Sequence, residues 1–341
     1  MNIMKATIKR LTAIFCFTAL LVGMTACDNS SSAPTSSKNG QEQPDAQSEQ
    51  YKISVIVNTL SSEYWGYVTA GARAYQTDHP NIQVEINGPP SETAYDEQLN
   101  MIETVLTSGE YDGMVVSPLQ AESTAVVIEN ADIPIVSMNT PIESDVIMTH
   151  VGTGNEAAAS EGGKAAVEAA KAAGWDEISA IAIAGTQGDP AGGQRLTGFQ
   201  KGIESAGGTF LADETQYADW TADKAVSAME AIMQKYPNGI AIIVACNDDM
   251  AMAAARAAKG IEAFQNTIFC GFDGNQSACE SILNGDLTMS VAQDPFNMGY
   301  TAVDCVIKAI QQEPLDSFVD TGCSIVTREN AQERLDTLKD Y

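Results

Sequence analysis

The chain has 341 residues and a formal net charge of −27 at pH 7, from 18 basic and 45 acidic side chains. Hydrophobic residues make up 44% of the chain and charged residues 18%, a composition typical of a globular protein and not of a disordered one. Such an excess of negative charge repels nucleic acid and anionic lipid head groups, so we expect no nucleic-acid partner but neutral small molecules or basic protein surfaces.

Residues 1–26 have the layout of a secretory signal peptide. A cationic start at residues 5–10 is followed by an apolar run over residues 11–22 and by a small residue before Cys27. This run is shorter than the about 20 apolar residues that a membrane span needs. The segment resembles a bacterial lipoprotein signal, which implies cleavage before Cys27 and lipidation of the Cys27 thiol. The alternative is an ordinary signal peptide in which Cys27 is incidental.

Residues 27–50 are expected to form a lipidated cysteine followed by a disordered tether. Positions 28–50 are mostly Ser, Gln, Asn, Pro and Asp, and they bury too little apolar surface to offset their ordering entropy. Each buried methylene of an acyl chain contributes about 0.8 kcal/mol, so two or three chains form a stable anchor. The lipoprotein resemblance therefore implies an extracytoplasmic protein that is anchored to the outer face of the cytoplasmic membrane.

From residue 51 onward, short apolar runs alternate with helical stretches. Strands are predicted at 53–58, 82–86, 113–117, 133–138, 178–184, 209–215, 240–246, 267–272 and 287–292. Helices are predicted at 64–79, 97–107 and 121–130, and amphipathic or Ala-rich stretches follow the later strands. Apolar strands separated by helices indicate parallel sheets covered on both faces. About 290 residues exceed one ordinary core, so the pattern predicts an α/β protein with two doubly wound, parallel-sheet lobes.

The residues that directly follow the predicted strands are the candidate site, because ligands of open α/β sheets bind beyond the carboxyl ends of the strands. They are Asn58-Thr59, Ser117-Pro118, Asn139-Thr140, Gly185-Thr186, Asp219-Trp220, Asn247-Asp248, Asp273-Gly274 and Gln293-Asp294. Nearly all are small, polar or aromatic, and no catalytic cluster is among them. This combination indicates a pocket that hydrogen-bonds an uncharged molecule.

Five cysteines remain after Cys27, namely Cys246, Cys270, Cys279, Cys305 and Cys323. Their number is odd, and no CxxC or Cys/His spacing suggests zinc or a redox pair. Buried free thiols are therefore expected.

Several motifs carry a family resemblance. Residues 244–252 read VACNDDMAM and residues 269–274 read FCGFDG, with further matches at 58–65, 133–139, 192–199 and 289–295. From residue 51 to 327 the chain closely resembles the ribose/galactose-type periplasmic binding proteins, the sugar-capturing components of ABC importers.

The resemblance implies the type I periplasmic binding protein fold, with two lobes joined by three chain crossings near Val151, Asp294 and Asp320. The N-terminal lobe would comprise residues 51–152 and 294–320, and the C-terminal lobe residues 153–293 and 321–341. A ligand would sit between the lobes and favour their closed arrangement. The partners implied are the permease subunits of an ABC importer, and the protein itself is expected to be a monomer.

The resemblance also assigns roles to side chains. Tyr64 and Trp65 match aromatics that stack on a sugar ring, and Trp220 matches the aromatic of the opposite lobe. Arg195 matches a donor and Asp273 an acceptor of sugar hydroxyls. The whole expected ligand site is Asn58, Ser62, Tyr64, Trp65, Ser117, Asn139, Thr140, Arg195, Trp220, Asn247, Asp273 and Gln293, in which the amides of Asn247 and Gln293 both donate and accept.

Residue chemistry alone allows other interpretations of four of these side chains. Tyr64 and Trp65 could be core residues of a helix, Arg195 could be a surface charge, and Asp273 could be a turn former before a glycine. With Arg195 as the cation and Asp273 as the anion, the expected pocket is balanced, which favours a neutral ligand of monosaccharide size.

The ribose proteins carry an Asp-Arg pair where this chain has Asn139-Thr140. The difference argues against ribose and leaves hexoses, inositols, other polyols, nucleosides and furanose-like signals open. The calcium loop of the glucose/galactose proteins is not evident, so neither a metal nor a cofactor is expected.

Other protein classes fit less well. Residues 152–154 superficially copy a dinucleotide fingerprint, but the acid expected about 20 residues later is missing, so no enzyme is expected. Transcription regulators that share the sensor fold carry an N-terminal helix-turn-helix, where this chain has a signal segment. A sensory subunit that presents its ligand to a receptor stays open.

Overall fold

The computed structural model describes residues 49–341. The predicted signal segment, Cys27 and nearly all of the tether lie outside the described residues. Within residues 49–341, no helix combines the length and the apolar character needed to cross a membrane.

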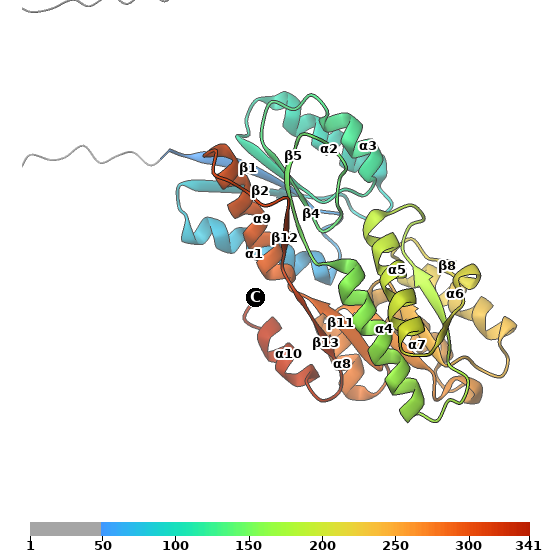
Figure 1. Ribbon diagram of the computed structural model, residues 1–341. Coiled ribbons are helices and arrows are strands. Elements are labelled where there is room, and N and C mark those ends of the chain that lie inside the picture. Colours follow the sequence, from blue (N-terminus) through green and yellow to red (C-terminus); the bar gives the residue numbers. More distant parts are fainter. Residues whose placement is uncertain (1–48) are drawn as a thin grey trace, which may run out of the picture. The chain divides into compact units, whose positions relative to one another are not determined.

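Two sheets organise the described chain (Figure 1). The first sheet has the order β12 (Phe318–Asp320), β5 (Ile147–Gly152), β4 (Ile135–Met138), β3 (Gly113–Val116), β1 (Tyr51–Ile56) and β2 (Ile82–Asn87). The second has the order β13 (Cys323–Val326), β11 (Met289–Gln293), β10 (Ile268–Asp273), β9 (Ile242–Ala245), β6 (Ser179–Ala184) and β7 (Thr209–Phe210), and β8 (Gln216–Tyr217) also pairs with β6. All neighbours are parallel except β13, which is antiparallel to β11.

Helices cover both faces of each sheet. On the first sheet, α1 (Glu63–Asp78) and α9 (Pro295–Ile310) pack on one face and α2 (Tyr95–Ser108) and α3 (Ala121–Ile128) on the other. On the second, α4 (Asn155–Ala172) and α5 (Pro190–Ser205) pack on one face, and α6 (Ala222–Lys235), α7 (Asp248–Ala258), α8 (Gln276–Asn284) and α10 (Ala331–Leu338) on the other. Short 3₁₀ turns lie at Ala212–Glu214 and Glu262–Phe264.

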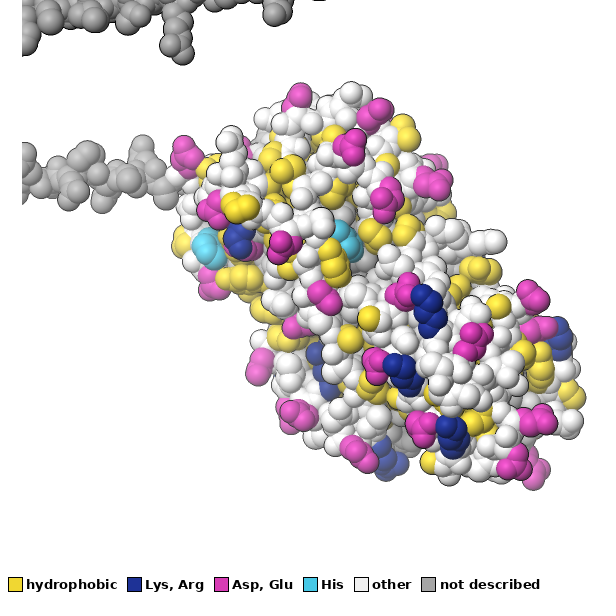
Figure 2. All heavy atoms as spheres, in the orientation of Figure 1, with side chains coloured by type: hydrophobic (Ala, Val, Ile, Leu, Met, Phe, Trp, Pro, Cys, Tyr) yellow, Lys and Arg dark blue, Asp and Glu magenta, His cyan; other side chains and the backbone are white. Residues whose placement is uncertain are grey.

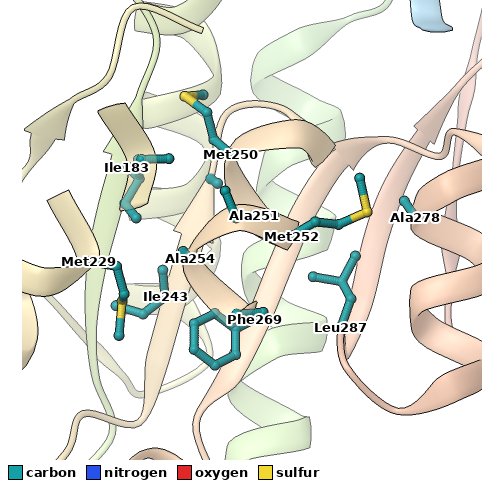
Figure 3. Packing of buried hydrophobic residues seen from close by; sticks show 14 of the residues in the cluster. Ile183, Met229, Ile243, Met250, Ala251, Met252, Ala254, Phe269, Ala278 and Leu287 are labelled. Atoms are coloured by element: carbon teal, nitrogen blue, oxygen red, sulfur yellow. The ribbon is translucent and has the colours of Figure 1, made fainter. Parts of the chain in front are cut away.

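The apolar runs become central strands because a parallel sheet covered on both faces buries every residue of such a run. All four residues of β9 are buried, and alternate residues point to opposite faces. On one face, Ile243 and Phe269 pack beneath α7, whose Ala251 and Ala254 let the helix lie close to the sheet (Figure 3). Met250, with its flexible side chain, packs at the end of this core.

Helices α1 and α9 cross with their backbones in contact, and glycine makes this possible. A Cβ atom on Gly71 would lie 1.9 Å from the carbonyl oxygen of Phe296, and one on Gly299 would lie 1.9 Å from that of Val68. This close crossing holds α1, with Tyr64 and Trp65 in its first turn, against the first sheet.

The chain passes between the sheets after β5, after β11 and between β12 and β13. The predicted fold class, two doubly wound parallel α/β sheets, is confirmed. The predicted strand at 209–215 is wrong in detail, because only its first two residues form a strand, β7, and a 3₁₀ turn follows at Ala212–Glu214. The strands β5, β12 and β13, of which β13 is antiparallel to its neighbour, were not predicted.

The five cysteines of the described chain are all free. Four are buried as expected, but Cys323 is exposed on β13 at the edge of the second sheet.

Candidate ligand-binding site

A small cavity lies where loops that follow the strands of both sheets meet. Its lining from the first sheet is Asn58, Ser62, Tyr64, Trp65, Glu92, Asn139 and Thr140, and from the second Asp189, Arg195, Trp220, Asn247, Asp249 and Asp273. The enclosed volume is about 40 Å³, which is room for roughly three water molecules. The lining is mostly polar, and the loops of the two sheets would have to move apart to admit a molecule as large as a monosaccharide.

Ten of the twelve residues expected from the sequence line this cavity, and Ser117 and Gln293 do not. Ser117 is fully buried behind it, and its carbonyl accepts a hydrogen bond from Gln98 Nε2 at 2.9 Å. Gln293 Nε2 donates to Asp273 Oδ1 at 2.8 Å, so this side chain supports a lining residue from behind.

Three lining residues were not predicted, namely Glu92, Asp189 and Asp249. Asp189 precedes a proline that begins a helix, an N-cap signal that could have placed it at the strand ends. The carboxyl groups change the expected electrostatics. The balance of one cation and one anion is wrong, because four carboxyl groups and a single arginine line the cavity.

Tyr64 and Trp65 occupy the first turn of α1. Their rings meet edge to face with centroids 5.1 Å apart, and both side chains are buried. Tyr64 donates its hydroxyl proton to Asn139 Oδ1 at 3.1 Å, and Trp65 Nε1 donates to Glu92 Oε1 at 2.9 Å. These residues belong to the core of the first sheet and line the cavity as well, so both interpretations of their position hold.

Trp220 faces the cavity from the second sheet. Its backbone has φ 65°, a left-handed conformation, and its carbonyl accepts a hydrogen bond from Asn247 Nδ2 at 3.2 Å. A Cβ atom on Gly185 would lie 2.1 Å from Trp220 Cε2, so only glycine lets the indole lie there. The ring is thus held in place before any ligand arrives.

Arg195 is 3% exposed, which excludes a role as a surface charge. Its Nε donates to Asn155 Oδ1 at 2.8 Å, and its Nη1 donates to the Cys246 carbonyl at 2.5 Å. The guanidinium lies 3.9 Å over the ring of Phe272 and 3.7 Å from Asp273 Oδ1. These contacts fix its orientation.

Asp273 ends β10 with φ 128° before Gly274. Burial raises the pKa of Asp273, and Arg195 opposes that shift. Burial also raises the pKa of Glu92 to about 7 and raises the pKa of both Asp189 and Asp249. The carboxyl groups of this cavity therefore hold their protons to a higher pH than exposed ones.

The arrangement suits binding. Amides, hydroxyls, carboxyl groups and one arginine surround a space that indole and phenol rings border from both sheets. Among residues 49–341, no group of three or more His, Cys, Asp or Glu is placed to hold a metal ion.

Comparison with known proteins agrees with this geometry. Residues 53–314 match the periplasmic binding protein domain family. The D-allose-binding periplasmic protein of Escherichia coli (strain K12) is 26% identical over 268 residues, which cover 76% of this chain and 84% of that protein.

Two solved structures with bound sugars are similar at 25% identity. A carbohydrate transporter solute binding protein from Agrobacterium radiobacter in complex with D-arabinose has a TM-score of 0.75 and covers 85% of this chain and 98% of its own. An ABC transporter solute binding protein from Agrobacterium vitis with bound D-fucose has a TM-score of 0.74 and covers 82% and 96%. These relatives are binding proteins and not enzymes, and the present chain belongs with them to the periplasmic binding protein family.

Proposed function

We propose that this protein captures a neutral monosaccharide or polyol outside the cytoplasmic membrane and delivers it to the permease of an ABC importer. The observation that carries the proposal is the cavity itself, where Trp220 and the Tyr64–Trp65 pair border a ring of mixed donors and acceptors. Sugar faces rich in C–H groups pack well on aromatic rings, while their hydroxyls need such a ring of polar groups.

The additional carboxyl groups are compatible with a neutral ligand, because a carboxylate is a strong acceptor for hydroxyl donors. The relatives with bound D-arabinose and D-fucose, and the allose-binding relative, support an uncharged sugar. Neutral Asn139 and Thr140 at the cavity wall argue against ribose, whose binding proteins carry a charged pair there. Hexoses, inositols, other polyols, nucleosides and furanose-like signals remain the candidate classes.

Capture is proposed to proceed by closure of two lobes, residues 51–152 with 294–320 and residues 153–293 with 321–341. A ligand that contacts lining residues of both sheets binds the closed arrangement more tightly than the open one, and it shifts the population accordingly. A monomer is sufficient for this mechanism.

Lipidation of Cys27 is proposed to hold the protein at the outer face of the cytoplasmic membrane, with residues 28–50 as the tether. The acidic side chains spread over the visible face of the folded part, with fewer lysines and arginines between them (Figure 2), disfavour binding to anionic lipid without such an anchor. A sensory subunit that presents the same ligand to a receptor would need the same site, and a permease gene next to this one would favour transport.

The proposal is tested by thermal-shift screening of the protein from residue 28 onward against sugars, polyols, nucleosides and amino acids. A neutral sugar or polyol at 100 times its Kd should add about 2.7 kcal/mol to the free energy of unfolding. The proposal fails if only charged compounds, or none of these compounds, raise the melting temperature.

A further inference from the structure

We propose that Glu92 binds the ligand directly and forms, with its neighbours, a subsite that accepts hydrogen bonds from two adjacent hydroxyls of a sugar ring or polyol. Glu92 lies outside the set of residues expected from the strand ends, and the inference rests on the proposed function.

The position of Glu92 is fixed from both sides. Trp65 Nε1 donates to Oε1 at 2.9 Å, and Asn58 Nδ2 donates to Oε2 at 3.3 Å. An ionised carboxylate offers about four acceptor positions, so two positions remain after these bonds. Because Glu92 also lines the cavity, the free positions are available to a bound molecule.

The surroundings of Glu92 supply further acceptors. Asp189, the N-cap residue of α5, and Asp249, in the first turn of α7, line the same cavity, and their negative charges add to the burial that raises the pKa of Glu92. Asp189 uses one oxygen to accept from the Gly192 backbone N–H at 2.6 Å. The carboxyl group of Asp249, which also lines the cavity, forms no hydrogen bond with another residue in the range 49–341.

Asn58 gives an independent sign that a donor is missing. Its Oδ1 is buried and has no hydrogen-bond partner among the described residues, although the side chain lines the cavity and is 7% exposed. A buried acceptor without a partner costs about 1–3 kcal/mol. A ligand hydroxyl at this end of the cavity would remove that cost.

Arg195, the cation of the cavity, does not contact the end at which Glu92 lies. Arg195 is committed to Asn155 and Cys246 and lies beside Asp273. The cavity is therefore polarised, with a donor at Arg195 and acceptors around Glu92. A ring oxygen, a methyl ether or an anionic group would be repelled near Glu92, so two free neighbouring hydroxyls are required at this end of the cavity.

The test measures Kd by isothermal titration calorimetry for D-allose, D-arabinose and D-fucose and for the monodeoxy analogues of the sugar that binds tightest. The proteins are the wild type, Glu92→Gln, Glu92→Ala and the control Glu97→Gln, whose side chain is exposed on α2. Glu92→Gln should raise the Kd of the parent sugar by about 10- to 100-fold. Glu97→Gln should keep this Kd within about twofold of the wild-type value. For each analogue that lacks one of the two hydroxyls bound at this subsite, the difference in Kd between wild type and Glu92→Gln should be smaller than for the parent sugar.

Two results overturn the inference while the proposed function stands. In the first, Glu92→Gln binds the parent sugar as tightly as the wild type does. In the second, Glu92→Gln raises the Kd of the parent sugar and of every analogue by the same factor, which would mean that Glu92 only positions Trp65 and Asn58. If neither these sugars nor any neutral sugar or polyol of the thermal-shift screen binds to the wild type, the proposed function fails first and the subsite with it. If Glu92→Ala fails to fold, the isosteric Glu92→Gln and the analogue series on the wild type still test whether Glu92 binds the ligand.

Discussion

Glu63 at the start of α1 forms a hydrogen bond with Gln276 at the start of α8, although the two helices pack on different sheets. Its Oε1 accepts from the backbone N–H of Gln276 at 2.7 Å and from that of Ser277 at 3.3 Å. Asn275 precedes α8 without a side-chain cap of its own. Glu63 thus supplies the missing cap from the other sheet, and it connects the two sheets without involving a ligand.

Glu63→Ala should favour the open arrangement and weaken ligand binding. A carboxylate at a helix N-terminus contributes about 0.3–1 kcal/mol, so Kd should rise by roughly two- to fivefold. Small-angle scattering of the ligand-free protein should show a larger radius of gyration than for the wild type. Glu122→Ala removes an exposed acid from the first turn of α3 and serves as the control. An unchanged radius and Kd would show that the cap does not influence closure.

Asp273→Ala and Trp220→Ala should each abolish the thermal shift given by the sugar that binds tightest. The first change removes a charged acceptor beside Arg195, and the second removes the stacking surface of the second sheet. Losses of about 2–3 kcal/mol, or roughly 30- to 150-fold in Kd, are expected for each.

Tyr217→Ala and Asp213→Ala, both on the exposed surface, are the controls for these two variants. Circular dichroism should show all four variants folded. A thermal shift that persists in Trp220→Ala or Asp273→Ala would contradict the assignment of this cavity as the ligand site.

Gly185→Ala should displace Trp220, because its new methyl group would occupy the place of the indole. The fluorescence spectrum should change, and Kd should rise by at least about tenfold as the ring leaves the cavity. Gly193→Ala on α5 is the matched control, since a Cβ atom there has no neighbour within 4 Å. Equal sugar affinity in both variants would mean that the ring position does not matter for binding.

The strand ends were predictable because parallel strands within one sheet end at the same edge, so residues such as Asn58 and Asn139 had to lie together. Glu92 could not be predicted in this way. It lies five residues beyond the last residue of β2, in a loop with two prolines, and its side chain returns to the cavity only through its bonds with Trp65 and Asn58. A pattern of apolar runs carries no information about such a return.

The contact between Glu63 and Gln276 could not be predicted from the sequence either. It joins residues 213 positions apart on two different sheets, and only the placement of one sheet against the other brings them together. The run at 209–215 was misjudged for a local reason, because a 3₁₀ turn at Ala212–Glu214 interrupts the apolar stretch. Within single sheets most central strands were predictable from the sequence, whereas relations between the sheets required the structure.

Cys27→Ser should release the protein from membranes of the native host into the medium or periplasm. The substitution removes the thiol that the lipid would modify and leaves the residues after position 27 unchanged. Cys323→Ser, which removes the exposed cysteine of the folded part, should leave the protein in the membrane fraction. If Cys27→Ser stays there through detergent-free washing, the anchor assignment is wrong.

The free energy of unfolding of the ligand-free protein should fall as pH rises from about 4.5 to about 7 through the contribution of Glu92. Burial raises the pKa of Glu92 from 4.5 to about 7, so between these values the folded state holds a proton that the unfolded state has lost. Stability falls with rising pH wherever the folded state binds more protons. One pKa unit corresponds to about 1.4 kcal/mol, and partial solvent screening reduces the total to about 1–3 kcal/mol.

Urea unfolding of the wild type and of Glu92→Gln at pH 4.5, 6 and 7.5 isolates this contribution. Asp189, Asp249 and Asp273 have pKa values raised in the same direction, so the wild type should lose stability through them too. Glu92→Gln cannot titrate, and its advantage over the wild type should therefore grow with pH and level off above about 7. A stability difference between the two proteins that stays constant from pH 4.5 to 7.5 would show that Glu92 ionises as readily in the folded protein as in the unfolded chain.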